Sequence, residues 1–202
     1  MTPWEYCASA QQNPRQSIRS HMKSSRFFMI SLIVGASVTT PSSAVSQDLP
    51  QKGYRAEFYQ VLASAEGDFV ALAEAMPERL YAWRPSEGVR SYGEVCLHIA
   101  MTNFSGPRMI GATLPSGLEP EGYEQSITEK AEIVAELKRS FDHLRSAVLS
   151  ISDSEADTEI AGWYGPTTYR GALHIMNEHL GEHLGQSIAY ARVNGIVPPW
   201  NR

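Results

Sequence analysis

Two histidines near the C-terminus, His179 and His183, are four residues apart in the segment Asn177-Glu-His-Leu-Gly-Glu-His-Leu-Gly-Gln186. On an α-helix this spacing places both imidazoles on one face, about one turn apart, which is the geometry of a chelate. A third histidine, His98, lies in another helical pattern, Ser91-Tyr-Gly-Glu-Val-Cys-Leu-His-Ile-Ala100. Three imidazoles are a normal protein ligand set for a catalytic divalent metal, so we expect His98, His179 and His183 to bind one.

The residue Glu182 lies between the paired histidines, and His179-Leu-Gly-Glu-His183 also matches the H-x-x-E-H pattern of inverted zinc peptidases. Those peptidases take a further acidic ligand from well downstream, whereas 19 residues follow His183 here. We therefore set the peptidase interpretation aside. If water is the nucleophile at the metal, Glu182 is the expected catalytic base.

The remaining histidines of this region are expected outside the site. His174 is five positions before His179, about 140° around a helix, so the two side chains do not share a face. His143 is flanked by charged residues and is expected at the solvated surface. The alternative for the pair His179 and His183 is two partly buried histidines that bind carboxylates rather than a metal.

Other side chains have both a chemical and a packing interpretation. Cys96 faces away from the histidine of its own helix and is expected to be a structural thiol, while Glu94 is expected mainly to cap that helix. Gly181 and Gly185 lie roughly opposite the histidine pair, where small residues permit close packing within a bundle or a dimer. Three aromatic residues of the loops either line a pocket or simply pack, namely Trp83, Trp163 and Tyr164.

Four helical patterns must position these residues. They are expected at residues 54–76, from 91 towards 107, at 126–148, and from 167 or 168 to about 194. The second and third begin with capping-box patterns, Ser91-x-x-Glu94 and Ser126-x-x-Glu129. Residues 106–122 are rich in proline and glycine and are expected to form a long loop, which leaves room for a crossover connection. With no clear strand pattern, the sequence predicts an all-α, antiparallel four-helix bundle.

The apolar stripe of the first of these helices is expected to face the core. It repeats at intervals of three and four residues from Tyr54 until Pro77 ends the helix. Its predicted members are Tyr54, Phe58, Val61, Ala65, Phe69, Leu72 and Met76.

The beginning of the chain predicts export. Lys23 and Arg26 precede an apolar segment at residues 27–38, and small residues follow it, which is the order of a secretory signal peptide. Met22 is a better start for this signal than Met1. The apolar segment is too short to span a bilayer comfortably, so we expect cleavage rather than stable membrane insertion. Residues 1–46 are thus assigned to an extension and signal peptide, residues 47–202 to the mature domain, and the protein to the periplasm or the exterior.

The charge of the mature chain argues against a nucleic-acid partner. Removing residues 1–46 removes four of 17 basic residues and one of 22 acidic residues, which leaves a formal charge of −8. An acidic chain is a poor ligand for nucleic acid. The cleavage also removes Cys7, so Cys96 has no intrachain disulfide partner.

Taken in order, these landmarks resemble the DinB/YfiT-like superfamily. The resemblance rests on Ser91-Tyr-Gly-Glu-Val-Cys-Leu-His-Ile-Ala100, on His179-x-x-x-His183-x-Gly185-Gln186 and on Tyr190-Ala-Arg-Val-Asn-Gly-Ile-Val-Pro-Pro199, and it covers residues 52–200. It implies a four-helix bundle, often a homodimer, with a zinc- or nickel-type metal on the three histidines and an open position for water or substrate.

The resemblance implies a breadth of functions. Relatives include thiol-dependent S-transferases, a mycothiol-linked isomerase and proteins described as metal-dependent hydrolases. A metal with an open position lowers the pKa of a bound water or thiol, so both reaction types fit one site. Because low-molecular-weight thiol cofactors are cytosolic, the export signal favours a hydrolase of a small-molecule substrate. The alternatives are a metal-dependent thiol S-transferase and a non-enzymatic metal-binding or stress-related bundle, whose metal a fourth protein ligand would close.

Overall fold

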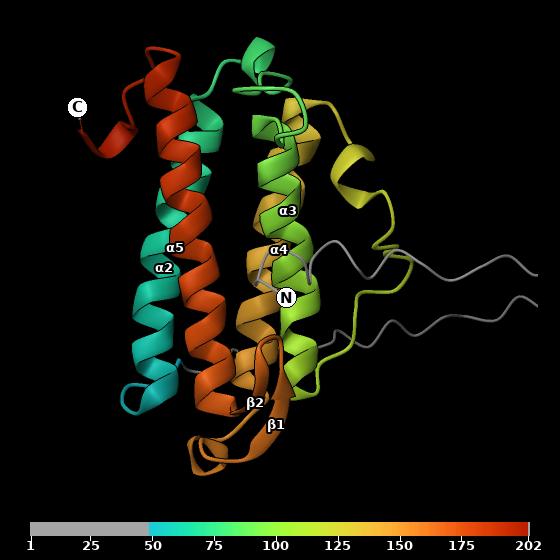
Figure 1. Cartoon of the computed structure of the whole chain (residues 1–202). Helices are drawn as coiled ribbons and strands as arrows, with labels where there is room; N and C mark the ends of the chain where they lie inside the picture. Colours follow the sequence, from blue (N-terminus) through green and yellow to red (C-terminus); the bar gives the residue numbers. More distant parts are fainter. Residues whose placement is uncertain (1–48, 202) are drawn as a thin grey trace, which may run out of the picture. The chain divides into compact units, whose positions relative to one another are not determined.

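The computed structural model describes residues 49–201, which are mostly helical (Figure 1). The four long helices are α2 (Tyr54–Ala75), α3 (Tyr92–Ser105), α4 (Lys130–Leu149) and α5 (Tyr169–Val193). Within the described part of the chain, no helix is long and apolar enough to cross a membrane. The predicted signal peptide and its cleavage point lie outside the described residues.

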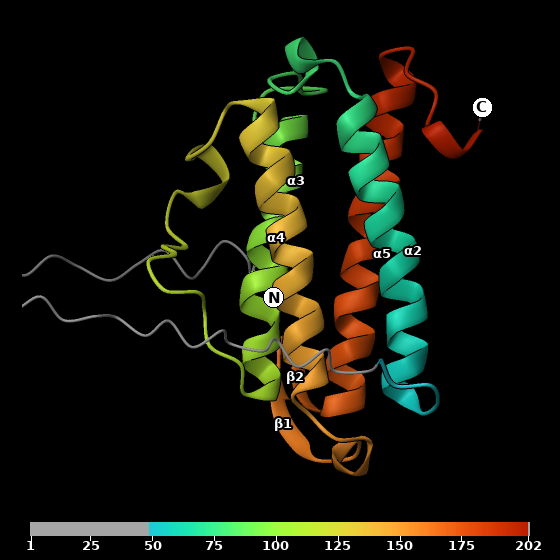
Figure 2. The ribbon, with the colours of Figure 1, turned by 180° about the vertical axis from the view of Figure 1, so that it is seen from behind.

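The helices form two parallel pairs rather than a simple antiparallel bundle. In Figures 1 and 2, α2 and α5 run from the lower end of the bundle to the upper end, whereas α3 and α4 both run downwards. Helix α3 packs chiefly on α4, and α2 packs on α5. The antiparallel prediction is therefore wrong for these neighbours. The reason is the connection at residues 106–129, which returns from the lower end of α3 to the upper end of α4 as a crossover.

One of the two predicted capping boxes is formed. At the start of α3, the Ser91 hydroxyl accepts from the Glu94 amide and the Glu94 carboxylate accepts from the Ser91 amide at 2.6 Å. The second prediction is wrong, because α4 begins only at Lys130 and has no side-chain cap. The hydroxyl of Ser126 instead donates to the carbonyl of Tyr123 at 2.8 Å, closing the 3₁₀ turn η4 (Tyr123–Gln125).

A small hairpin corrects the all-α prediction. Strands β1 (Glu159–Gly162) and β2 (Gly165–Thr168) pair antiparallel, with Trp163 and Tyr164 in the two-residue turn. The positive φ of 117° at Gly165 suits glycine, which lacks the Cβ that disfavours this region. The Thr168 hydroxyl then caps α5 by accepting from the Gly171 amide, so the hairpin leads directly into the helix that carries two of the three histidines.

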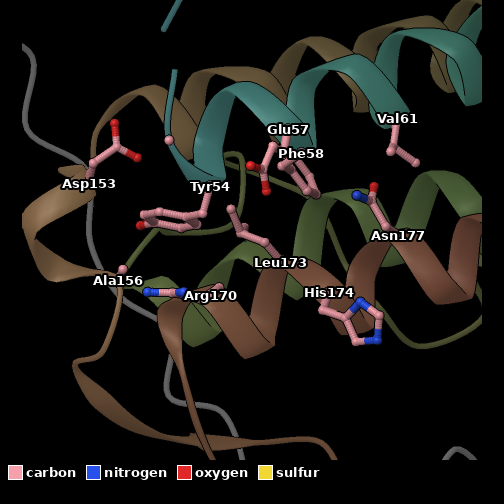
Figure 3. A pocket seen from close by; sticks show the side chains of 11 residues that line it. Tyr54, Glu57, Phe58, Val61, Asp153, Ala156, Arg170, Leu173, His174 and Asn177 are labelled. Atoms are coloured by element: carbon pink, nitrogen blue, oxygen red, sulfur yellow. The ribbon is translucent and has the colours of Figure 1, made fainter. Parts of the chain in front are cut away.

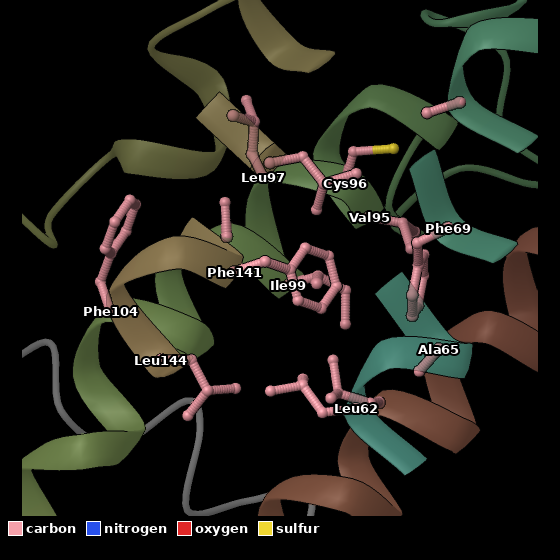
Figure 4. Close-up of a cluster of buried hydrophobic side chains, with 14 of the residues drawn as sticks. Leu62, Ala65, Phe69, Val95, Cys96, Leu97, Ile99, Phe104, Phe141 and Leu144 are labelled. Carbon is pink, nitrogen blue, oxygen red and sulfur yellow. The ribbon is translucent and has the colours of Figure 1, made fainter. Parts of the chain in front are cut away.

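The core lies between the helices and holds α3 in place. Figure 4 shows Phe69 of α2 and Phe141 of α4 among the apolar side chains, and their ring centroids are 6.2 Å apart. Leu62 is fully buried beside them, and burying such a side chain contributes about 1.5–3 kcal/mol. Val61, predicted in the core stripe, is 51% exposed because its neighbour Leu62 takes the inward position. The thiol of Cys96 is buried in this core, as expected for a structural cysteine.

Candidate metal centre

The three predicted histidines come together between α3 and α5. One ligand nitrogen from each of His98, His179 and His183 lies within 4.8 Å of the others, and Nε2 of His98 is 3.1 Å from Nε2 of His179. His98 and His183 are 9% and 8% exposed, while His179 is partly exposed. The sequence prediction that these side chains meet is therefore confirmed.

His98 is oriented by a carboxylate that the sequence analysis missed. Nδ1 of His98 is 2.7 Å from Oε1 of Glu124 in η4, and Arg90 donates to both oxygens of Glu124 at 2.6 and 3.0 Å. Burial acts to raise the pKa of Glu124, but the hydrogen bonds from His98 and Arg90 outweigh it and hold the pKa at about 2. Because an ionised carboxylate can only accept, Nδ1 of His98 must donate, which leaves the lone pair on Nε2.

A second chain of hydrogen bonds orients His183. Its Nδ1 is 2.7 Å from Oε1 of Gln186, whose Nε2 donates to the Tyr190 hydroxyl at 3.0 Å. That hydroxyl donates to the backbone carbonyl of Arg90 at 3.1 Å. Since a carbonyl can only accept, every proton in this chain points away from His183, so its Nδ1 donates and its Nε2 carries the lone pair.

The remaining ligand, His179, has no such partner within the described residues. Its Nδ1 is buried without a hydrogen bond. Burial and, to a smaller extent, the neighbouring His183 and His98 lower the pKa of His179 to about 2, so the ring is neutral. Burial also lowers the pKa of His183. Neutral imidazoles are the form that binds a metal, and the convergence of these nitrogens could hold a metal ion.

The turn of the hairpin covers one side of the cluster. The ring of Trp163 lies edge-on to His179, with centroids 5.9 Å apart. Trp163 also packs on Gly106, where an added Cβ would lie 3.3 Å from the indole. Of the two roles left open for this residue, packing against the site is the one that these contacts describe.

Glu182 and the other two described histidines are not among the clustered ligands. The Glu182 side chain is exposed, and its charge acts to raise the pKa of the adjacent His183. His174 is not part of the cluster, as predicted; it is exposed and lines a separate cleft of about 530 Å³ between α2 and α5, which the three clustered histidines do not line (Figure 3). The prediction of a solvated His143 is wrong, because its ring is partly buried against Phe104 and burial lowers its pKa.

The helix glycines are not packed against the rest of this chain. Gly181 and Gly185 are exposed, and a Cβ added at either would meet no described atom within 4 Å. The prediction that they permit close packing within the bundle is therefore wrong, while a role in a homodimer stays a prediction. Glu94 is occupied by its cap and by an ion pair with Arg84 at 3.0 Å.

Some residues of the hydrogen-bond chains that orient the histidines could be predicted from the sequence, and others could not. Gln186 and Tyr190 follow His183 by three and seven residues, so helical periodicity alone places them on its face. Glu124 is 26 residues from His98 in an irregular connection, and no local pattern relates the two. The same holds for Arg90, which precedes the cap of α3.

Comparisons with known proteins agree with this architecture. The family model described as the DinB superfamily matches residues 62–187. A crystal structure of a DinB-like protein from Bacillus cereus ATCC 10987 has a TM-score of 0.59 at 17% identity, covering 70% of this chain and 93% of that one. A DinB-like protein from Bacillus subtilis has a TM-score of 0.56 at 22% identity, covering 70% and 94%. No curated protein matches the sequence.

Proposed function

This chain belongs to the DinB superfamily, and on that premise we propose that it is a metal-dependent hydrolase of a small-molecule substrate. The observation that carries the proposal is the cluster of His98, His179 and His183, whose ligand nitrogens lie within 4.8 Å of one another. Two of these histidines are also oriented with Nδ1 as the donor, so that the lone pair lies on Nε2, which is the state that a metal requires.

The number of donors supports catalysis over a purely structural metal. Within the described residues the cluster supplies three protein ligands, and tetrahedral sites with three protein ligands keep one position for water or substrate. When bound, a divalent metal acts as a Lewis acid and lowers the pKa of coordinated water towards neutral pH. His179 is partly exposed, and we infer that a substrate reaches the cluster past this residue.

Two carboxylates are candidates for the general base. Glu124 is a poor one, because its oxygens are engaged by Arg90 and His98 and its pKa is held at about 2. Glu182 is exposed beside His183, and we assign to its carboxylate the proton released from the attacking water. The substitution Glu182→Gln keeps the size of the side chain and removes its basicity, so it should lower hydrolysis without releasing the metal.

Metal content is the first test. Protein purified without chelator and without a nickel-affinity tag should contain one divalent ion per chain by elemental analysis. His98→Ala and His179→Ala should each abolish stoichiometric binding. The control is His174→Ala, which removes an exposed histidine of α5, the helix that carries His179, and should leave the metal content unchanged. Full metal content in His98→Ala or His179→Ala would remove that residue from the site.

Activity is the second test. Metal-loaded protein should hydrolyse a member of an ester, amide and phosphoester panel, and chelation should abolish the reaction. A parallel panel of thiols with electrophiles distinguishes transfer from hydrolysis. Turnover only in the thiol panel would replace the hydrolase by an S-transferase, and silence in both with one metal per chain would favour the non-enzymatic bundle.

A further inference from the structure

Both hydrogen-bond chains that orient the metal-binding histidines end on the same residue, Arg90. Its guanidinium donates to Glu124, the partner of His98. Its backbone carbonyl accepts from Tyr190, which ends the chain that begins at His183. Arg90 lies just before the N-cap of α3, so one residue connects α3, the crossover connection and α5.

We propose that Arg90, Glu124 and Gln186 are positioning residues that fix the tautomers of His98 and His183 and thereby set the metal affinity. This inference rests on the proposed metal site. It adds to that site two outer partners and the residue that joins them, none of which contributes a ligand atom to the cluster.

The two hydrogen-bond chains impose the same tautomer, although one ends on a group that only donates and the other on a group that only accepts. A guanidinium has donors and no acceptor, so it demands a pure acceptor at Glu124, and that acceptor demands a donor at Nδ1 of His98. A backbone carbonyl is a pure acceptor, so it takes the Tyr190 proton and leaves that hydroxyl to accept from Gln186. The Gln186 amide is then turned with its oxygen towards His183, whose Nδ1 must also donate.

Because both Nδ1 atoms must donate, the two isosteric substitutions Glu124→Gln and Gln186→Glu should have different effects on the tautomers. In Glu124→Gln, one amide oxygen replaces two carboxylate oxygens that accept from three donors, Nε and Nη2 of Arg90 and Nδ1 of His98. When that oxygen accepts from Nε of Arg90, the amide donors face Nδ1 of His98, and the imidazole proton must move to Nε2, where it blocks metal binding. In Gln186→Glu, by contrast, the new carboxylate still accepts from Nδ1 of His183, so the productive tautomer is kept.

The experiment reads the tautomers directly in the full chain. Long-range nitrogen–proton NMR spectra of the chelator-treated protein should show Nδ1 protonated in His98 and His183. Glu124→Gln should move the proton of His98 to Nε2 and weaken zinc binding about 10- to 100-fold in competition with a chromophoric chelator. Gln186→Glu should keep both tautomers and bind zinc at least as tightly as the original chain.

A neighbouring carboxylate supplies the control. Glu136 of α4 accepts from the Tyr123 hydroxyl at 2.6 Å and from Arg139, so it holds the same turn without touching a histidine. Glu136→Gln should leave both tautomers and the zinc affinity unchanged. An equal loss of affinity in Glu136→Gln and Glu124→Gln would show that only docking of the turn matters and would overturn the proposal.

Each remaining outcome of these experiments also decides for or against the proposal. Unchanged His98 tautomer and affinity in folded Glu124→Gln would overturn the proposal, as would a loss of affinity in Gln186→Glu. If Glu124→Gln does not fold, Tyr190→Phe tests the other chain, since it frees the Gln186 amide to turn and should populate the Nε2-protonated form of His183. If the original chain binds no zinc, the proposed function fails, while the tautomer spectra still decide whether the network sets them.

Discussion

Replacing Gly181 and Gly185 with alanine tests whether the surface of α5 opposite the metal centre is free. Both glycines lie inside the helix, and neither is among the residues with positive φ. A Cβ at either position would meet no described atom within 4 Å, so the structure offers no steric cost. Alanine in a helix interior is about 0.8–1.0 kcal/mol more favourable than glycine. The double variant should therefore gain about 2 kcal/mol if its surface is solvated.

The assay is thermal unfolding with a chelator present, so that no metal contributes. For a domain of this size, about 2 kcal/mol should raise the Tm by about 4–8 °C. Gly67→Ala is the matched control, since Gly67 is an exposed glycine of α2 with the same free space and should raise the Tm by about half as much. Light scattering after gel filtration reports the oligomer in parallel.

The outcomes distinguish two readings of the same glycines. If a homodimer packs through this face, the added methyl groups should lower the Tm of the double variant and shift the protein towards monomer, while Gly67→Ala still raises it. If the Tm of Gly67→Ala does not rise, the argument that an added Cβ with no atom within 4 Å stabilises the helix is refuted. A rise in all variants with no change of oligomer would exclude close packing of a second copy on this face.

Two further predictions concern the cysteine and the N-terminus. Burial raises the pKa of the Cys96 thiol to about 12, so the thiol stays protonated at pH 8. In a Cys7→Ser background, Cys96 should react with a disulfide reagent only as fast as the chain unfolds. Rapid labelling of the folded protein would contradict this prediction. N-terminal sequencing of the exported protein should find a start near Val45 or Gln47, whereas recovery of residues 22–44 intact in the membrane would establish an uncleaved anchor.

Helical periodicity explains what the sequence predicted well. The four-residue spacing of His179 and His183 and the apolar stripe of α2 each depend on neighbours along one helix, so local geometry determines them. The capping box at Ser91 is local as well. The one expected at Ser126 failed because its serine and glutamate occupy a 3₁₀ turn and an uncapped helix start, and the same pattern fits both.

The features that the sequence did not predict leave no periodic pattern of apolar and polar residues along the chain. The four-residue strands of the hairpin contain Gly162, Gly165 and Pro166, so they show no alternation of apolar and polar residues that would mark them. Helix direction was also invisible, because an amphipathic stripe is the same whichever way the helix runs. The pairing of Glu124 with His98 requires the path of the crossover connection, which no periodic pattern encodes.

The crossover connection links the fold to the metal centre. Because α3 and α4 run in the same direction, the chain must return along the bundle between them, and η4 on this return path packs on α3. That path brings Glu124 to His98, and Arg90 at the start of α3 holds the carboxylate there. A short antiparallel hairpin of helices would place the three histidines equally well but would contain no such segment. The parallel pair therefore provides what the ligand spacing alone does not, a fixed proton on the far side of the His98 ring.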